Sequence, residues 1–185
     1  MTSHLHTNLE KQRLIEMAWL LNDLVVDLKT PTDIIKLARD SSLTQIQVMS
    51  IIRMTMCALL VNLSKLLEVL NFYGKDIRSL SPTVSGDLNS IKRELEKKGI
   101  YEYRSKYIAH AFMKEQGAPP RPLSLKEASN ALMKIIDEGL NPVTENAFSF
   151  CSWVYTKDEE KCVVNTIERT VNEIEVRFSG LGPRP

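Results

Sequence analysis

Apolar residues recur along this chain at steps of three and four, the spacing that places them on one face of a helix. The first such stripe begins at Leu14 and predicts a helix over about residues 8–28. Thr30 and Pro31 follow it, and a threonine before a proline is typical of a helix start. We therefore expect a short second helix that ends near Arg39.

The longest stripe predicts the central helix of the fold. Ser42 and Gln45 form a capping-box pair at its start, and Gly74 marks its end. The stripe covers more than one side of the helix, which favours an intramolecular bundle over a coiled-coil dimer seam. Arg53 and Asn62 interrupt it, either as solvated or hydrogen-bonded positions or as residues of a cleft. The main apolar members are Met49, Ile52, Met56, Leu59, Leu63, Leu66 and Leu70.

Punctuating glycines and prolines divide the rest of the chain. We expect a loop over residues 77–87, then a helix over 87–98 that ends in a left-handed Gly99. One helix of about fifteen residues should follow and stop before a proline-rich surface loop at 117–122. The last three helices are predicted over residues 124–139, 141–153 and 158–178.

Together these patterns predict an all-α fold, an up-down bundle of about seven helices of which four are long. No convincing alternating β pattern is present. With 185 residues the chain fits one domain, residues 1–185, with a disordered tip at 1–8 and a tail at 179–185.

Composition narrows the range of functions. The formal net charge is +1, so contact with nucleic acid or an anionic membrane would need a local patch. The odd set Cys57, Cys151 and Cys162 lacks a CxxC pair, which argues against disulfides and zinc. His4 and His6 could bind a metal, but a frayed terminus more often leaves such residues solvated.

The sequence also indicates a soluble, cytoplasmic protein without membrane contact. The first residues lack the apolar core of a secretory signal. The most apolar segment, residues 54–63, is too short to span a bilayer. Phosphate loops, dinucleotide-binding glycine patterns, zinc-protease motifs and nucleophile elbows are missing from the sequence, so we expect no cofactor and no metal.

One stretch, residues 101–110, concentrates residues that can act on a phosphodiester. On a regular helix Tyr103, Lys106, Tyr107 and His110 share a face, whereas Arg104 is rotated from His110 by roughly 120°. Arginine can clamp phosphate oxygens, and an imidazole with a pKa of about 6.5 can transfer a proton at neutral pH. The two would converge if the helix were distorted, if the arginine reached round, or if a second copy faced the first.

The run from Arg104 to His110, RSKYIAH, resembles the Arg-x(4 to 6)-His signature of HEPN domains, most closely the AbiU2-like branch associated with abortive infection. The resemblance implies a homodimer formed through the motif helix and metal-independent cleavage of RNA, as in toxins and antiviral effectors, with an antitoxin as a further partner. In that reading Arg104 holds and neutralises the phosphate, His110 transfers a proton or orients the scissile group, and the reaction leaves a cyclic phosphate end. Ser105 departs from the Asn, Asp or His common at that position in active members.

Three further residues of the stretch are candidate RNA contacts through charge and stacking: Tyr103, Lys106 and Tyr107. Two other interpretations stay open. The chain could be a non-catalytic helical module of the same fold that serves for dimerisation or partner binding. Arg104 could pair with Glu102 or a neighbouring helix, with His110 a satisfied residue near a helix end.

Overall fold

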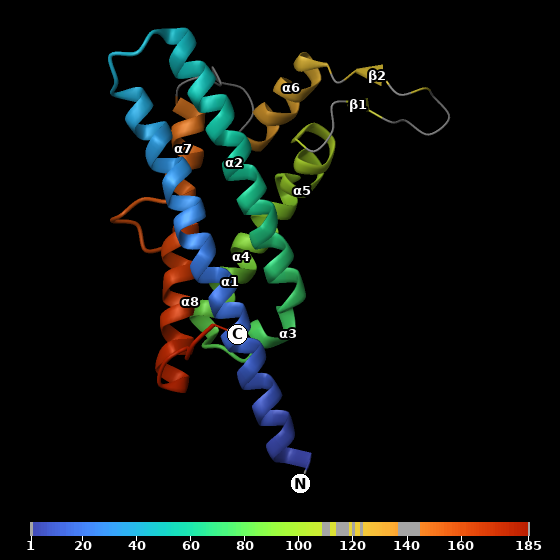
Figure 1. Cartoon of the computed structure of the whole chain (residues 1–185), viewed down its shortest axis with the longest axis vertical. Coiled ribbons are helices and arrows are strands. Elements are labelled where there is room, and N and C mark those ends of the chain that lie inside the picture. Colours follow the sequence, from blue (N-terminus) through green and yellow to red (C-terminus); the bar gives the residue numbers. More distant parts are fainter. Residues whose placement is uncertain are drawn as a thin grey trace.

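The computed structural model describes residues 2–108, 112–113, 119, 121–122, 124–136 and 145–184. Within these ranges the chain is almost entirely helical, which confirms the predicted all-α bundle (Figure 1). The helices are α1 (Thr2–Arg39), α2 (Gln45–Phe72), α3 (Gly74–Ile77), α4 (Pro82–Lys97), α5 (Ile100–Tyr103), the π-helical turn η1 (Arg104–Ile108), α6 (Leu125–Ile136), α7 (Glu145–Val154) and α8 (Val163–Phe178).

The predicted break at Thr30-Pro31 is wrong, because α1 continues through Pro31 to Arg39. Helix α1 also begins earlier than predicted, at Thr2. Proline lacks the N–H that would bind the carbonyl of Asp27. The side-chain amide of Asn62, on α2, donates to that carbonyl at 3.0 Å. The neighbouring helix thus supplies the donor that proline removes, and the interruption at Asn62 has a structural explanation.

Helix α2 begins two residues later than its predicted capping box. Thr44, not Ser42, is the N-cap: its hydroxyl accepts from the backbone N–H of Gln47 at 3.4 Å, and the Gln47 side chain accepts from the Thr44 N–H at 3.0 Å. Of the predicted stripe, Met49 is exposed while the remaining members are buried in the bundle. The stripe thus serves mainly as intramolecular core.

Two helix starts differ from the predicted ones by five residues. Helix α4 begins at Pro82, inside the predicted loop, because the hydroxyl of Ser81 caps it. The Ser81 backbone N–H and hydroxyl in turn donate to the carboxylate of Glu173, at 2.7 and 2.6 Å. Helix α8 begins late, at Val163, since its N-cap is Cys162, whose sulfur accepts from a backbone N–H.

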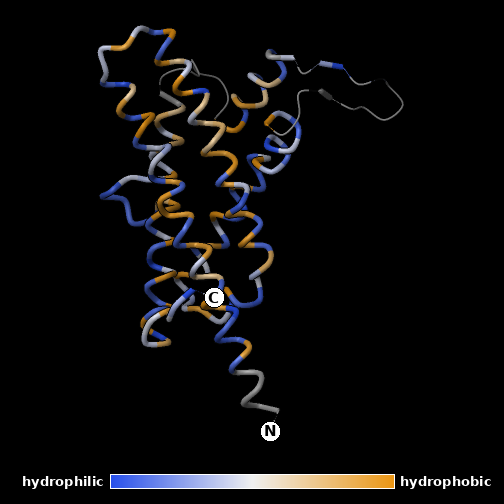
Figure 2. The backbone as a smooth tube through the Cα atoms, viewed as in Figure 1, coloured by the Kyte–Doolittle hydropathy of each residue, from blue (hydrophilic) through white to orange (hydrophobic). Residues whose placement is uncertain are grey.

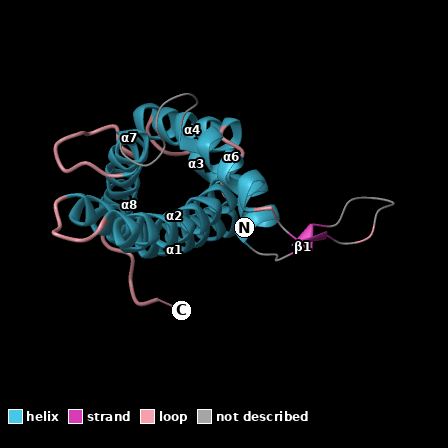
Figure 3. Ribbon diagram, turned by 90° about the horizontal axis from the view of Figure 1, so that it is seen from above, coloured by secondary structure: helices cyan, strands magenta, loops and turns pink. Residues whose placement is uncertain are grey.

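The single helix predicted after Gly99 is shorter than expected. Among the described residues it comprises α5 and η1, and residues 112–113 form a two-residue strand, β1 (Phe112–Met113), where the helix was predicted to continue. This strand pairs antiparallel with β2 (Arg121–Pro122), part of the segment predicted as a loop. The hairpin projects from the bundle (Figure 3). Gly139 and the Asn141-Pro142 pair lie outside the described residues. Helix α6 covers residues 125–136 of the helix predicted over 124–139, and α7 covers residues 145–153 of the helix predicted over 141–153.

The core is one continuous cluster with buried side chains from all the long helices. Helices α1 and α2 form an antiparallel pair, α7 and α8 lie along α1, and α4 lies behind them (Figures 1 and 2). By length and composition α2 could cross a membrane, with a mean hydropathy of 1.7 in its most apolar window. This differs from the expectation that the apolar segment 54–63 is too short to span a bilayer. It is weak evidence for a membrane span, because core helices of soluble bundles can be equally long and apolar.

Candidate functional site

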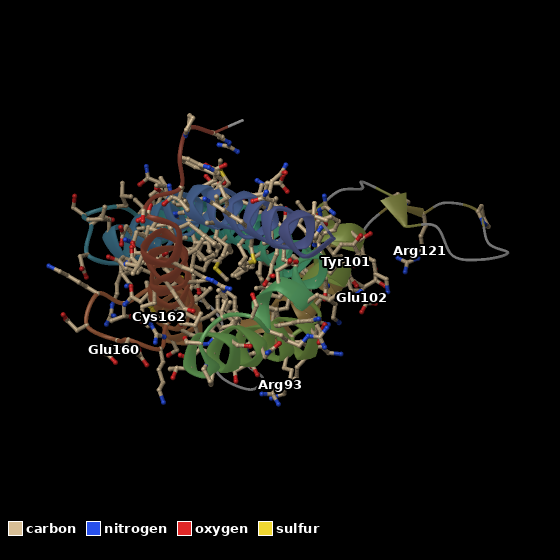
Figure 4. The ribbon with its side chains drawn as sticks, turned by 90° about the horizontal axis from the view of Figure 1, so that it is seen from below. Arg93, Tyr101, Glu102, Arg121, Glu160 and Cys162 are labelled. Atoms are coloured by element: carbon tan, nitrogen blue, oxygen red, sulfur yellow. The ribbon has the colours of Figure 1, made fainter. Side chains whose placement is uncertain are left out.

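The motif helix, which comprises α5 and η1, begins directly after Gly99. Gly99 adopts a left-handed conformation with φ of 66°, which ends α4 and turns the chain directly into α5. Helix α5 and η1 pack against α2, and Ile100 and Tyr103 anchor them in the core. Tyr101 and Glu102 point outward on the side of the molecule where the β hairpin projects (Figure 4).

The helix departs from α geometry at Arg104. Residues 104–108 form a π-helical turn, in which hydrogen bonds run from residue i to i+5 and each residue rotates less about the axis than in an α-helix. The roughly 120° separation expected for Arg104 and His110 on a regular helix therefore does not apply to this segment. His110 itself lies outside the described residues, as do the side chains of His4 and His6.

Arg104 lies at the surface beside α2. Its guanidinium is 3.6 Å from the carboxylate of Glu68 and 5.9 Å from the ring centroid of Tyr101. The Arg104 side chain is 40% exposed and that of Glu68 is 53% exposed. An ion pair this open contributes at most about 1 kcal/mol to stability. Arg104 is therefore held loosely and remains accessible to an anion from solvent.

Lys106 is paired within its own helix. Its ammonium donates to the carboxylate of Glu102, one turn earlier, at 2.5 Å. This hydrogen bond lowers the pKa of Glu102 and raises the pKa of Lys106, so both stay charged at neutral pH. Both side chains are solvent-exposed, and a bound anion would compete with Glu102 for Lys106.

Tyr103 and Tyr107 form a ring pair on the inner side of the motif helix. Their centroids are 5.2 Å apart with a 36° angle between the planes. Tyr103 is only 7% exposed, and burial raises the pKa of its phenol to about 12. Tyr107 is half-buried against the core. An RNA base could stack on Tyr103 only if the ring moved, so packing explains Tyr103 better than base contact does.

Arg104 lines neither of two hollows on the described surface. One, of 680 Å³, lies between α4, α6, α7 and α8 and is lined by Phe150 and Trp153. Another, of 720 Å³, lies where α2, α3 and α4 meet and is rich in basic residues. Among the described residues, no group of three or more His, Cys, Asp or Glu side chains could hold a metal ion.

The structure adds one residue to the site that the sequence did not indicate. Glu68 was part of the polar side of α2 and carried no local signal of a partner in the motif helix. Arg53, the other polar interruption of α2, is exposed. No family model, curated protein or solved structure matches this chain.

Proposed function

We propose that the protein is a HEPN-like, metal-independent endoribonuclease of the toxin or antiviral type that acts in the cytoplasm. The observation that carries the proposal is the π-helical turn at residues 104–108, which begins at the motif arginine and leaves that side chain half exposed. Such turns are rare and occur frequently at functional sites.

The chemistry assigned to Arg104 requires it to exchange Glu68 for a phosphate. A phosphodiester oxygen offers a charge-assisted acceptor in place of the carboxylate, and the existing contact at 3.6 Å is longer than a good hydrogen bond. Glu68 would then keep the guanidinium oriented until RNA arrives. His110 would take the proton of the 2′-hydroxyl or deliver one to the leaving oxygen.

A homodimer through the motif helix is part of the proposal. Ile46 and Met54, on the N-terminal half of α2, are 77% and 70% exposed. Around the helix axis each lies within about 40° of Glu68, the partner of Arg104. This apolar surface therefore continues the side of α2 that η1 contacts. A second copy that covered it would lie on the same side of α2 as Arg104.

A non-catalytic dimerisation or partner-binding module of the same fold is the second candidate. It is favoured by the ion pair of Arg104 with Glu68 and by the burial of Tyr103, because both give structural roles to residues of the motif stretch. In that case the motif helix forms an interface, and Arg104 orients that helix against α2 and takes no part in RNA cleavage.

RNA cleavage in excess EDTA tests the first proposal. The wild-type protein is incubated with several single-stranded and structured RNAs beside Arg104→Ala and His110→Ala. Arg177→Ala serves as the control, because Arg177 is an exposed arginine on α8. We expect cleavage by the wild type and the control, and at least a hundredfold loss in both motif variants. Equal persistence of every RNA with all four proteins favours the binding module.

A further inference from the structure

A basic groove lies at the opposite end of α2 from the α1–α2 turn. It is formed where the end of α2 meets α3 and α4, and its volume is 720 Å³. This is within the range of roughly 300–1,000 Å³ that small-ligand clefts occupy, enough for one or two nucleotides at a time. The residues that give it its character are Arg13, Phe72, Lys75, Asp76, Arg78 and Lys92.

The groove carries four basic side chains and one acidic side chain, and the acidic one is already neutralised. Asp76 is 7% exposed and accepts three hydrogen bonds from the guanidinium of Arg13, at 3.1, 3.2 and 2.8 Å. These bonds raise the pKa of Arg13 and tie α1 to α3. The Arg13–Asp76 pair therefore fixes the wall of the groove, and Asp76 compensates the charge of none of the other three cations.

Lys75 and Arg78 are exposed, and in the part of the chain that the structure describes no carboxylate lies within ion-pair distance of either. Lys92 approaches Glu96 only at 3.9 Å. Three cations thus face one concave surface without a tight partner, although the chain as a whole has a net charge of only +1. This is the local patch that a polyanion requires.

An aromatic ring at the same groove distinguishes the kind of anion. Phe72 lies in the groove lining, yet its side chain is 67% exposed, which is unusual for a phenylalanine beside an intact core. The Arg13 guanidinium carbon lies 5.2 Å from the Phe72 ring centroid, and the ring centroids of Phe72 and Tyr73 are 4.9 Å apart with the planes at 76°. These contacts hold the ring while most of its surface remains open to a stacking base.

We propose that this groove binds single-stranded RNA, with Lys75, Arg78 and Lys92 on consecutive phosphates and a base stacked on Phe72. Cations that follow a backbone and an aromatic platform for bases are the two elements of single-strand binding. A bilayer surface, the other polyanion that accepts an exposed phenylalanine, fits a flat or convex patch better than a concave groove. The identity of the polymer rests on the proposed function.

The position of the groove suits that function. Phe72 follows Glu68, the partner of Arg104, by one turn of α2, a rise of about 6 Å. A strand bound along the end of α2 would therefore pass close to Arg104. The groove would hold the flanking part of the substrate and Arg104 the scissile phosphate, so loss of the groove should weaken binding without removing the chemistry.

The test measures binding and not cleavage. Full-length protein carrying His110→Ala is titrated into a fluorescein-labelled RNA octamer, and anisotropy gives Kd at several salt concentrations. The groove variant Lys75→Gln/Arg78→Gln is compared with Lys97→Gln/Lys157→Gln, which removes two exposed lysines outside the groove. Circular dichroism confirms that each variant is folded.

We expect the groove variant to raise Kd at least tenfold and the control to change it less than twofold. The slope of log K against log salt should fall by about 1.4, since each phosphate contact on a single strand contributes about 0.7. Phe72→Leu, which keeps an apolar side chain, should weaken binding about fivefold or more through the lost stack. Equal Kd values for the groove variant and the control would overturn the proposal.

Two further outcomes separate this proposal from the cleavage proposal. If no RNA is ever cleaved but the groove variant binds the octamer more weakly than the control does, the groove proposal is supported and the cleavage proposal is refuted. If RNA is cleaved and the groove variant binds like the control, only the groove proposal is refuted. Groove-dependent binding to phosphatidylserine vesicles without binding to the octamer would identify a membrane site and overturn the RNA assignment.

Discussion

Replacing Asn62 with alanine should destabilise the protein through a carbonyl on another helix. Pro31 leaves the carbonyl of Asp27 without its usual helical donor, and the amide of Asn62 binds that carbonyl at 3.0 Å. Alanine is a better helix former than asparagine, so α2 itself should not suffer. The loss should therefore report on the contact between α1 and α2.

The magnitude follows from the position of the bond near the surface. A hydrogen bond contributes about 0.5–1.5 kcal/mol net, and water can partly replace this donor, so Asn62→Ala should cost about 0.5–1 kcal/mol. For a chain of 185 residues this corresponds to a decrease in Tm of about 1–4 °C. Urea unfolding monitored by circular dichroism gives the free energy directly.

A double-mutant cycle with Pro31→Ala isolates the cause. Alanine at position 31 restores the backbone N–H to the Asp27 carbonyl, so it should stabilise the protein by up to about 3 kcal/mol. In that background the cost of Asn62→Ala should fall to less than half of its wild-type value. An unchanged cost in both backgrounds would show that Asn62 acts through something other than the carbonyl that Pro31 leaves free.

Three other consequences can be measured. Glu68→Gln should change the free energy of unfolding by less than about 0.5 kcal/mol, because the Arg104–Glu68 pair is exposed to solvent. It should raise the affinity for RNA several-fold by releasing Arg104, and weaker RNA binding would contradict this. Burial raises the pKa of Tyr103 from 10.0 to about 12, so its contribution to the free energy of unfolding should be complete below pH 10 and be lost as the pH rises from 10 to 12. Urea titrations of Tyr103→Phe should show a smaller decrease over that range. Burial raises the pKa of Cys151 to about 12, so iodoacetamide at pH 8 should leave it unlabelled in folded protein and label it in urea, as read by mass spectrometry.

The apolar periodicity was sufficient to predict the all-α fold, because the stripes of α1, α2 and α8 are the surfaces that meet in the core. It was insufficient at Pro31, since a proline followed by a helical pattern normally begins a helix. The donor that allows α1 to continue comes from Asn62, on another helix. A local pattern cannot contain such a partner.

The candidate site, like the fold, could be predicted from the sequence only in part. The run from Arg104 to His110 could be found from sequence because all its residues lie in one short stretch. The π-helical turn, the contact with Glu68 and the burial of Tyr103 depend on how α5 and η1 pack against α2. The basic groove assembles side chains from α1, α2, α3 and α4, so no window of the sequence is visibly basic there.

The chemistry of the cleaved ends is the most direct test of the proposed ribonuclease. An RNA that the wild-type protein cuts in EDTA is compared with the same RNA carrying one 2′-deoxy sugar on the 5′ side of the cut. We predict a 2′,3′-cyclic phosphate end with a 5′-hydroxyl on the first RNA, no cut at that site in the second, and no product from Arg104→Ala. Cutting of the 2′-deoxy site, or undiminished cutting by Arg104→Ala, would contradict attack by the 2′-hydroxyl at an arginine-held phosphate.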